Sequence, residues 1–182
     1  MTDGDQWVHT SAPYLGAGHG QGDVWAEDAA ARGRRGTQTI VRAGKAAAPD
    51  EVAGALGLPA GAVVVERQRL IHLDGRTVES TRTYWPVAVA GGTALLGTRK
   101  IKGGAVALLA GLGYTAHLVR EDVQARMPDE DERAVLGLGP RDPVLHLVRQ
   151  TLDAGGVPFQ VDVSVFAAPT QRLRYELRVG GG

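Results

Sequence analysis

Apolar residues recur along the chain with two periods, and turn-forming residues separate the segments that follow each period. Spacing typical of short amphipathic helices, each with a glycine near its end, covers residues 23–33, 49–58, 103–114 and 128–139. Residues typical of β-strands cover 37–44, 63–73, 76–85, 115–127, 142–153, 157–167 and 173–179. The order of these elements predicts an α+β domain, in which helices flank an antiparallel sheet.

Two pairs of predicted strands are joined by short turns. Asp74-Gly75 separates the first pair, and Ala-Gly-Gly at 154–156 separates the second. Asp-Gly between β-type segments is a strong hairpin signal, and hairpins require antiparallel pairing. No linker divides residues 23–179, which we interpret as one domain between a flexible N-terminal arm at 1–22 and a glycine tail at 180–182.

Composition narrows the function classes. The 182 residues carry a formal net charge of zero, without the basic surplus typical of nucleic-acid binding, so we expect no direct nucleic-acid contact by this chain. The absence of cysteine excludes thiolate metal sites, and the five histidines are scattered, so we expect neither metal nor cofactor. The N-terminal residues lack a signal-peptide core and no apolar run is long enough to span a bilayer, which predicts a soluble cytoplasmic protein with no membrane contact.

The first hairpin contains more polar residues than a hairpin needs. Side chains alternate across a strand, so Arg67 and Arg69 share one face, while Glu79 and Thr81 share one face of the partner strand. A two-residue loop places Glu79 opposite Leu70, on the face away from the arginines. A loop one residue longer places Glu79 beside the arginines, and the sequence leaves both registers open.

The second hairpin raises the same question. Gln160, Asp162, Ser164 and Phe166 share a face that is too polar for a core, and Arg149 lies on the preceding strand. Arginine forks bind carboxylates and phosphates in bidentate fashion, so the arginines of both hairpins predict a site for a small anionic molecule. The simpler alternative is that these side chains face solvent on a one-sided sheet.

A second candidate anion site precedes the helix predicted at 103–114. Arg99 and Lys102 come just before this helix, and Gly103 and Gly104 lie at its start. A helix N-terminus offers free backbone N–H groups and a positive dipole end, which together favour a phosphate or carboxylate. A solvated loop is the alternative interpretation.

Several segments in a fixed order resemble one known family. VVERQRL begins at residue 64, DGRTVESTRTYWP at 74 and GGAVALLAGLGY at 103. The motifs A-R-x-P, L-G-L-G, P-V-L-x-L-x-R and G-x-P follow at 125, 136, 143 and 156. Together they resemble a UTRA domain, the effector-binding half of HutC-type regulators in the GntR family, over about residues 35–179. Residues 7–34 are similar to the lead-in of some such proteins.

This resemblance implies a chorismate-lyase-like fold and a homodimer. In relatives that bind sugar phosphates, arginines like Arg67 and Arg69 and a glutamate like Glu79 contact the ligand, with help from the helix start near residues 102–105. Gln160 occupies a position that is often glutamate, and Phe166 one that is often tyrosine. These two departures imply an effector that differs in polarity from an amino-sugar phosphate.

Two functions from different classes follow. The favoured one is an effector-binding domain for a small anionic molecule, in a transcription regulator that lacks its own DNA-binding domain because no recognition helix fits in residues 1–22. No residue is catalytic in that case. The alternative is a stand-alone enzyme of lyase, cyclase or isomerase type acting on an anionic biosynthetic intermediate. Its acid or base would be Glu79, Glu121 or Asp162, with the histidines at 72, 117 and 146 as further candidates.

Overall fold

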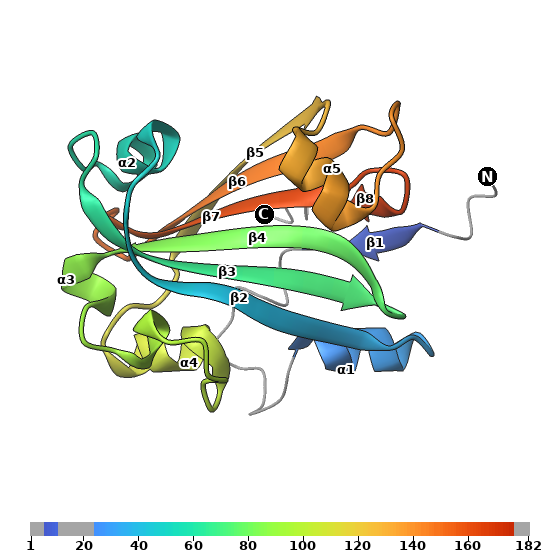
Figure 1. Ribbon diagram of the computed structural model, residues 1–182. Coiled ribbons are helices and arrows are strands. Elements are labelled where there is room, and N and C mark those ends of the chain that lie inside the picture. Colours follow the sequence, from blue (N-terminus) through green and yellow to red (C-terminus); the bar gives the residue numbers. More distant parts are fainter. Residues whose placement is uncertain (1–5, 11–23, 177–182) are drawn as a thin grey trace, which may run out of the picture.

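The computed structural model describes residues 6–10 and 24–176 (Figure 1). Six strands form one antiparallel sheet in the order β2-β3-β4-β7-β6-β5, and two short strands form a separate parallel pair, β1-β8. The strands are β1 Trp7–His9, β2 Gly36–Ala47, β3 Val63–Leu73, β4 Arg76–Pro86, β5 Leu118–Arg126, β6 Val144–Leu152, β7 Pro158–Ala167 and β8 Gln171–Leu173. The helices are α1 Val24–Ala31, α2 Asp50–Leu56, α3 Val87–Ala90, the 3-10 helix η2 Ala94–Leu96, α4 Gly104–Gly111 and α5 Glu130–Leu136.

The predicted α+β architecture is confirmed, and all four predicted helices are present as α1, α2, α4 and α5. The prediction of a last strand over 173–179 is wrong in its bounds, because β8 ends at Leu173 and residues 174–176 are not in a strand. Three short elements were not predicted: β1, α3 and η2. β1 lies within the segment interpreted as a flexible arm, and the rest of that segment, apart from residues 6 and 10, is outside the described residues.

The first hairpin turns at Asp74 and Gly75, as the sequence indicates. Both residues have positive φ, 51° and 83°, which is the backbone that a type I′ turn requires. Leu73 pairs with Arg76 directly across the turn, so the loop contains two residues. Aspartate adopts positive φ more readily than most residues. Here its carboxylate also accepts from the backbone N–H of Arg35, just before β2, at 2.8 Å.

The register of this hairpin changes just beyond the turn. Ile71 pairs with Glu79, so Val78 is an extra residue on β4 and forms a β-bulge. The bulge brings Glu79 onto the face that carries Arg67 and Arg69. Both registers considered from the sequence were therefore wrong in part: the loop has two residues, yet Glu79 lies with the arginines. The inserted residue is in the strand, where the buried Val78 side chain joins an apolar cluster.

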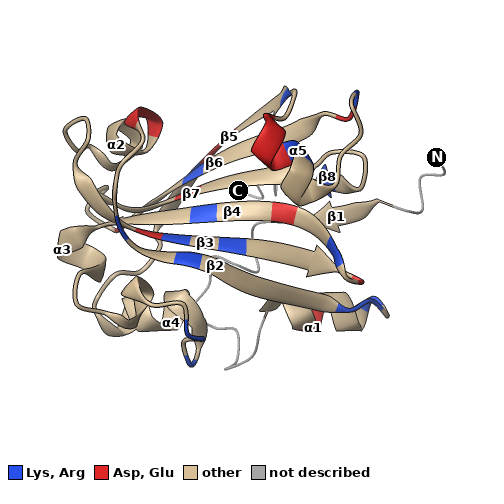
Figure 2. Ribbon diagram, in the orientation of Figure 1, with Lys and Arg blue, Asp and Glu red and all other residues tan. Residues whose placement is uncertain are grey.

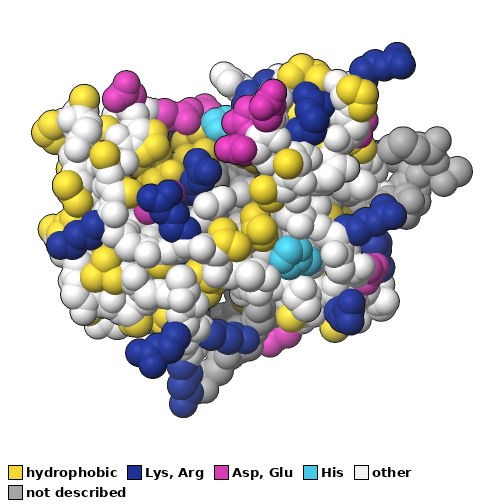
Figure 3. All heavy atoms as spheres, in the orientation of Figure 1, with side chains coloured by type: hydrophobic (Ala, Val, Ile, Leu, Met, Phe, Trp, Pro, Cys, Tyr) yellow, Lys and Arg dark blue, Asp and Glu magenta, His cyan; other side chains and the backbone are white. Residues whose placement is uncertain are grey.

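The bulge also prevents two arginines from opposing each other. An unbroken register would pair Arg67 with Arg82, whereas the structure pairs Arg67 with Thr83. Arg82 instead projects from the other side of the sheet, where it and Arg42 approach the carboxylate of Glu66 at 3.9 and 3.3 Å. On that side, basic side chains gather near the middle of the surface (Figure 3).

The sheet has two distinct faces. We call the face of Arg67 the arginine face and the other the opposite face. On the opposite face, α2 packs on Val64, Tyr84 and Val161, and α5 packs on Val165 through Leu136. These contacts form an ordinary apolar layer. Among the described residues, no helix has the length and apolar character that crossing a membrane requires.

The arginine face is apolar only at its two ends. At one end Trp85 packs with Leu109 of α4, and at the other end Ile71 packs with Trp7 and Trp25. We call these the Trp85 end and the Trp25 end. Helices and β1 close both ends, so the polar side chains between them lie on a rigid sheet with apolar walls on two sides.

Candidate functional site

Five side chains form a continuous row across the middle of the arginine face, one from each of five adjacent strands. The pairing runs from β3 through β4, β7 and β6 to β5, and each member lies directly opposite the next. We call this set the polar row, in the order Arg67, Thr83, Asp162, Arg149 and Glu121. The sheet register alone therefore brings together candidates that are far apart in the sequence.

Most of the polar row is internally bonded. The Thr83 hydroxyl donates to Asp162 at 2.7 Å, and Arg149 Nε donates to Glu121 at 2.6 Å. Burial alone would lower the pKa of Arg149, but the carboxylates of Asp162 and Glu121 outweigh burial and raise this pKa above its ordinary value. Arg149 is thus held as a cation between two acids and is already neutralised by the protein.

Arg67 has no such acid. Its residue is 5% exposed, and none of the salt bridges among the described residues includes Arg67 or Arg69. Burial and the neighbouring Arg69 charge lower the pKa of Arg67. Its Nη2 donates to the Arg99 carbonyl at 2.6 Å, while its buried Nε has no hydrogen-bond partner in the described structure. An uncompensated buried guanidinium is costly unless an anion binds beside it.

A row of hydroxyls runs beside the arginines. Thr81 lies opposite Arg69, and Thr81 lies opposite Ser164 on β7. The Thr81 and Ser164 hydroxyl oxygens are 2.7 Å apart, and the Thr81 hydroxyl donates to the carboxylate of Glu79. Thr81 and Ser164 are buried and Glu79 is half-buried, so this part of the arginine face combines two hydroxyls with one carboxylate.

Gln160 and Phe166, the two departures from the family pattern, also lie on this face. The Gln160 side chain accepts a hydrogen bond from Trp85 Nε1 at 2.9 Å and donates to Asp162 at 2.8 Å. Its amide is therefore engaged at both ends, between the Trp85 end and the polar row. Phe166 is buried and lies opposite Glu79, where it adds an apolar wall and no hydroxyl.

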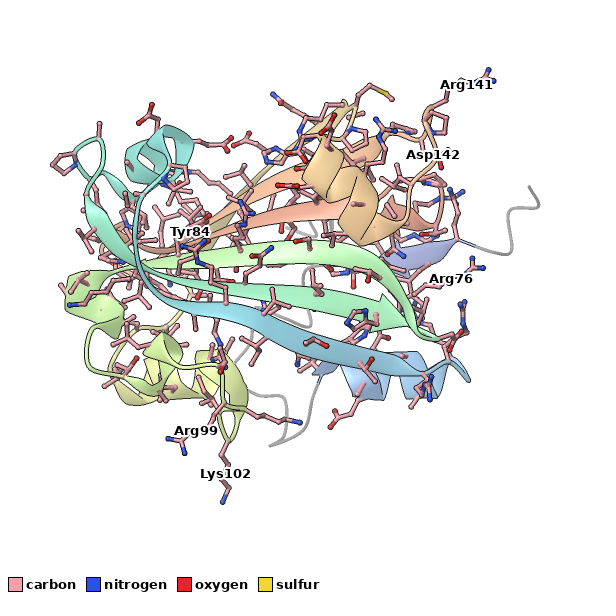
Figure 4. All side chains as sticks on the ribbon, in the orientation of Figure 1. Arg76, Tyr84, Arg99, Lys102, Arg141 and Asp142 are labelled. Carbon is pink, nitrogen blue, oxygen red and sulfur yellow. The ribbon has the colours of Figure 1, made fainter. Side chains whose placement is uncertain are left out.

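The loop before α4 meets the site through its backbone. Arg67 binds the carbonyl of Arg99, but the side chains of Arg99 and Lys102 are exposed and point away from the body of the protein (Figure 4). Gly103 and Gly104 have φ angles of 76° and 78° at the start of α4. The structure thus does not bring these two cations together with Arg67, and their role in anion binding stays a prediction.

Two residues near the site were missed from the sequence. His9 of β1 is buried, and its ring lies 5.2 Å from the Phe166 ring; burial lowers its pKa, and the charges of Glu79 and Arg149 act on it. Tyr175 bonds to Glu121, and burial together with this bond raises its pKa to about 12. The short β-type run at Trp7 and Val8 was the available signal for His9, but it lay within the presumed arm.

The remaining sequence candidates lie elsewhere. His72 is placed between the hydroxyls of Thr39 and Thr77, each 3.2 Å from a ring nitrogen. His146 projects from the opposite face, and His117 lies just before β5. Within the described ranges, no group of three or more histidine or acidic side chains is placed to hold a metal ion.

Comparison with known proteins identifies the fold and the family. The sequence profile of the UTRA domain matches residues 31–171. An uncharacterized HTH-type transcriptional regulator of Streptomyces coelicolor is 30% identical over 146 residues, which cover 79% of this chain and 53% of that protein. The chain thus spans about half the length of this curated relative.

Solved structures agree with the fold. PhnF from Mycobacterium smegmatis superposes with a TM-score of 0.76 at 22% identity, over 96% of this chain and 73% of that chain. The effector domain of the same PhnF superposes with a TM-score of 0.72 at 24% identity, over 88% of this chain and 98% of that chain. These likenesses confirm the expected UTRA architecture, and the sequence profile covers most of the chain. The chain therefore belongs to the UTRA domain family.

Proposed function

We propose that the arginine face binds a small anionic molecule, and that the chain is the effector-binding domain of a GntR-type transcription regulator of the HutC subfamily. The observation that carries this proposal is Arg67. It is a buried cation with an unpartnered Nε, beside a second arginine that no acid neutralises in the described structure. A protein tolerates such a group when a ligand anion completes its hydrogen bonds.

The charges on the arginine face indicate where the anionic group of a ligand would bind. Basic positions lie on β3, the strand next to the edge strand β2 (Figure 2). Because Asp162 and Glu121 already flank Arg149, the anionic group of a ligand is best placed at Arg67 and Arg69. The remainder of the ligand would lie over Thr81 and the neighbouring carboxylate, where hydroxyl or amine donors find acceptors.

Sensing is favoured over catalysis by the state of the candidate acids. Asp162 accepts from Thr83 and Gln160, and Glu121 accepts from Arg149. Both are committed to structure, and the third candidate, Glu79, accepts from the Thr81 hydroxyl, so we expect saturable binding without turnover. A solved relative that matches this chain over 98% of its own length is described as an effector domain, which fits this role. A homodimer in the cytoplasm, attached to a DNA-binding partner or domain, is part of the proposal.

Calorimetric titration with inorganic phosphate, sugar phosphates and small carboxylates tests the proposal. We expect at least one anion to bind saturably, without product formation by NMR, and Arg69→Ala to weaken binding by about 1–3 kcal/mol. Arg76→Ala is the matched control, because Arg76 lies in the same hairpin, is exposed and sits at the turn end of β4, where its side chain projects from the edge of the molecule (Figure 4). Equal losses in both variants, or no binding by any anion, would contradict the proposal.

A further inference from the structure

Three buried side-chain nitrogens have no hydrogen-bond partner in the described structure, and all of them are donors: Arg67 Nε, Trp7 Nε1 and Gln171 Nε2. Buried donors are rarely left unpaired, because an unpaired one destabilises the folded state. The proposed anion explains Arg67. It does not explain Trp7 and Gln171, which are directly paired residues of β1 and β8.

These two donors lie close to the arginines of the proposed site. Because Trp7 and Gln171 are paired, their side chains project from the same side of the β1–β8 pair. That side faces the Trp25 end, where Trp7 packs with Ile71 of β3, and both Trp7 and Gln171 are only 4% exposed. Ile71 follows Arg69 by two residues on the same face, a rise of about 7 Å along the strand. A small molecule is long enough to span this separation.

The Trp7 indole is held in place by two neighbours. The Arg32 guanidinium lies 4.0 Å from its ring centroid, and the Trp25 ring meets it edge to face with the centroids 5.0 Å apart. Arg32 also donates to the Val8 carbonyl at 3.0 Å, which ties β1 to α1. The Trp7 N–H is therefore fixed in direction, and an acceptor that reaches it binds without the cost of ordering this side chain.

We propose that Trp7 and Gln171 form a second subsite of the ligand site, which binds an uncharged oxygen acceptor at the far end of the ligand. We call it the acceptor subsite. The effector class is then an elongated monoanion that carries a carbonyl, ether or hydroxyl oxygen about 7 Å from its anionic group. This inference rests on the proposed anion site at Arg67 and Arg69, and it adds the chemical class of the ligand.

The surroundings of the acceptor subsite favour a neutral group over a second anion. Ile71 pairs with Glu79, so a carboxylate lies nearby and repels negative charge. Indole and amide N–H groups are themselves uncharged donors. Phe166 also pairs with Glu79, and its ring lies 5.2 Å from the His9 ring. These two rings offer an apolar contact to the body of the ligand.

A matched pair of aromatic carboxylates tests the acceptor subsite in the full chain. Para-acetylbenzoate carries a carbonyl oxygen at a suitable distance from its carboxylate, and para-isopropylbenzoate has a methyl group in place of that oxygen. In calorimetric titration we expect the acetyl compound to bind about tenfold more tightly, because it completes hydrogen bonds of buried donors. Gln171→Leu should remove most of this difference and leave the affinity for para-isopropylbenzoate unchanged. Gln68→Leu, the same change at a half-buried position on the opposite face, is the matched control and should preserve the difference.

The indole N–H signals of the wild-type protein give an independent readout by NMR. Trp25 Nε1 donates to the His72 carbonyl at 3.0 Å and Trp85 Nε1 donates to Gln160 at 2.9 Å, whereas Trp7 Nε1 has no acceptor in the described structure. Para-acetylbenzoate should move the Trp7 signal downfield, because a hydrogen bond deshields its proton, and para-isopropylbenzoate should not. The Trp25 signal should stay in place with both compounds, and Trp7→Phe assigns the Trp7 signal.

The possible outcomes separate the acceptor subsite from the anion site. Equal affinity for the two carboxylates, or a Trp7 signal that does not move, overturns the subsite and assigns both donors to enclosed water. Both of these readouts use the wild type, so they hold even if Gln171→Leu does not fold. Binding of inorganic phosphate without binding of either carboxylate overturns the subsite alone. Failure of every anion to bind overturns the proposed function together with the subsite.

Discussion

Replacing Arg67 with methionine should stabilise the unliganded protein while abolishing anion binding. Methionine has nearly the length of arginine and no charge, so it fills the same space. The guanidinium is buried, is repelled by Arg69 and leaves its Nε without a partner in the described structure. These are costs that the folded protein bears until an anion is bound. The substitution removes all of them at once.

The magnitude follows from the bonds of Arg67. The variant loses the bond from Nη2 to the Arg99 carbonyl, about 1.5–3 kcal/mol for a charged donor, and the exposed Arg99 loop allows water to replace it. It gains back about 1–3 kcal/mol from the unsatisfied Nε, and several kcal/mol from the desolvated charge. We expect a net stabilisation of about 1–3 kcal/mol, which raises the Tm by about 3 °C per kcal/mol for a domain of this size.

Urea unfolding and thermal melts of wild type and Arg67→Met, each without and with added anion, measure both effects. The wild type should gain stability when the anion is added, and the variant should not, because ligand that binds only the folded state stabilises by mass action. A variant that is less stable than wild type by more than about 1 kcal/mol would refute the reasoning, because Arg67 would then be a structural anchor.

Substitutions at three positions test other parts of the site. Arg69→Ala, at a half-buried position, should change the unfolding free energy little while weakening anion binding by about 1–3 kcal/mol, and a loss of folding with intact affinity would contradict this. Thr83→Val should destabilise by about 1–3 kcal/mol in urea, since Asp162 loses a buried donor, and Thr83→Ser should recover most of the loss. Burial lowers the pKa of His9 in the folded protein below its usual 6.5. Below pH 6.5 the unfolded chain therefore binds more protons than the folded chain. The free energy of unfolding should fall as the pH drops from 6.5 through the lowered pKa. His9→Phe should show a smaller loss between pH 7 and 5, and an unchanged pH dependence would contradict the assignment.

Local patterns were sufficient to predict most elements. Alternation and Asp-Gly located β3, β4 and their turn, and acidic starts with glycine stops located α2 and α5. The bulge at Val78 could not be predicted, because an extra valine in a β-type run leaves the local pattern unchanged. Its position is decided by packing against Trp7 and Trp25, which are distant in sequence.

The sequence predicted individual residues of the site but not their arrangement in space. The candidates Arg67, Glu79, Arg149 and Asp162 do lie on one face, as their types suggested. Their order as a row depends on β4 pairing with β7, a contact between distant segments that no local period encodes. The sequence also could not predict the direction of the Arg99 side chain. Its backbone carbonyl accepts a hydrogen bond from Arg67, while its charged side chain points into solvent.

The tryptophans at the two apolar ends allow the site to be followed by intrinsic fluorescence. Trp85 bonds to Gln160, which bonds to the polar row, so its indole is two hydrogen bonds from Asp162. At the other end the rings of Trp7 and Trp25 meet edge to face with their centroids 5.0 Å apart, and Trp7 lies on β1, the strand that carries His9. Emission from Trp85 should therefore report events at the arginines, and emission from the Trp7–Trp25 pair should report the seating of β1. Single-tryptophan variants would separate the two signals without any added label.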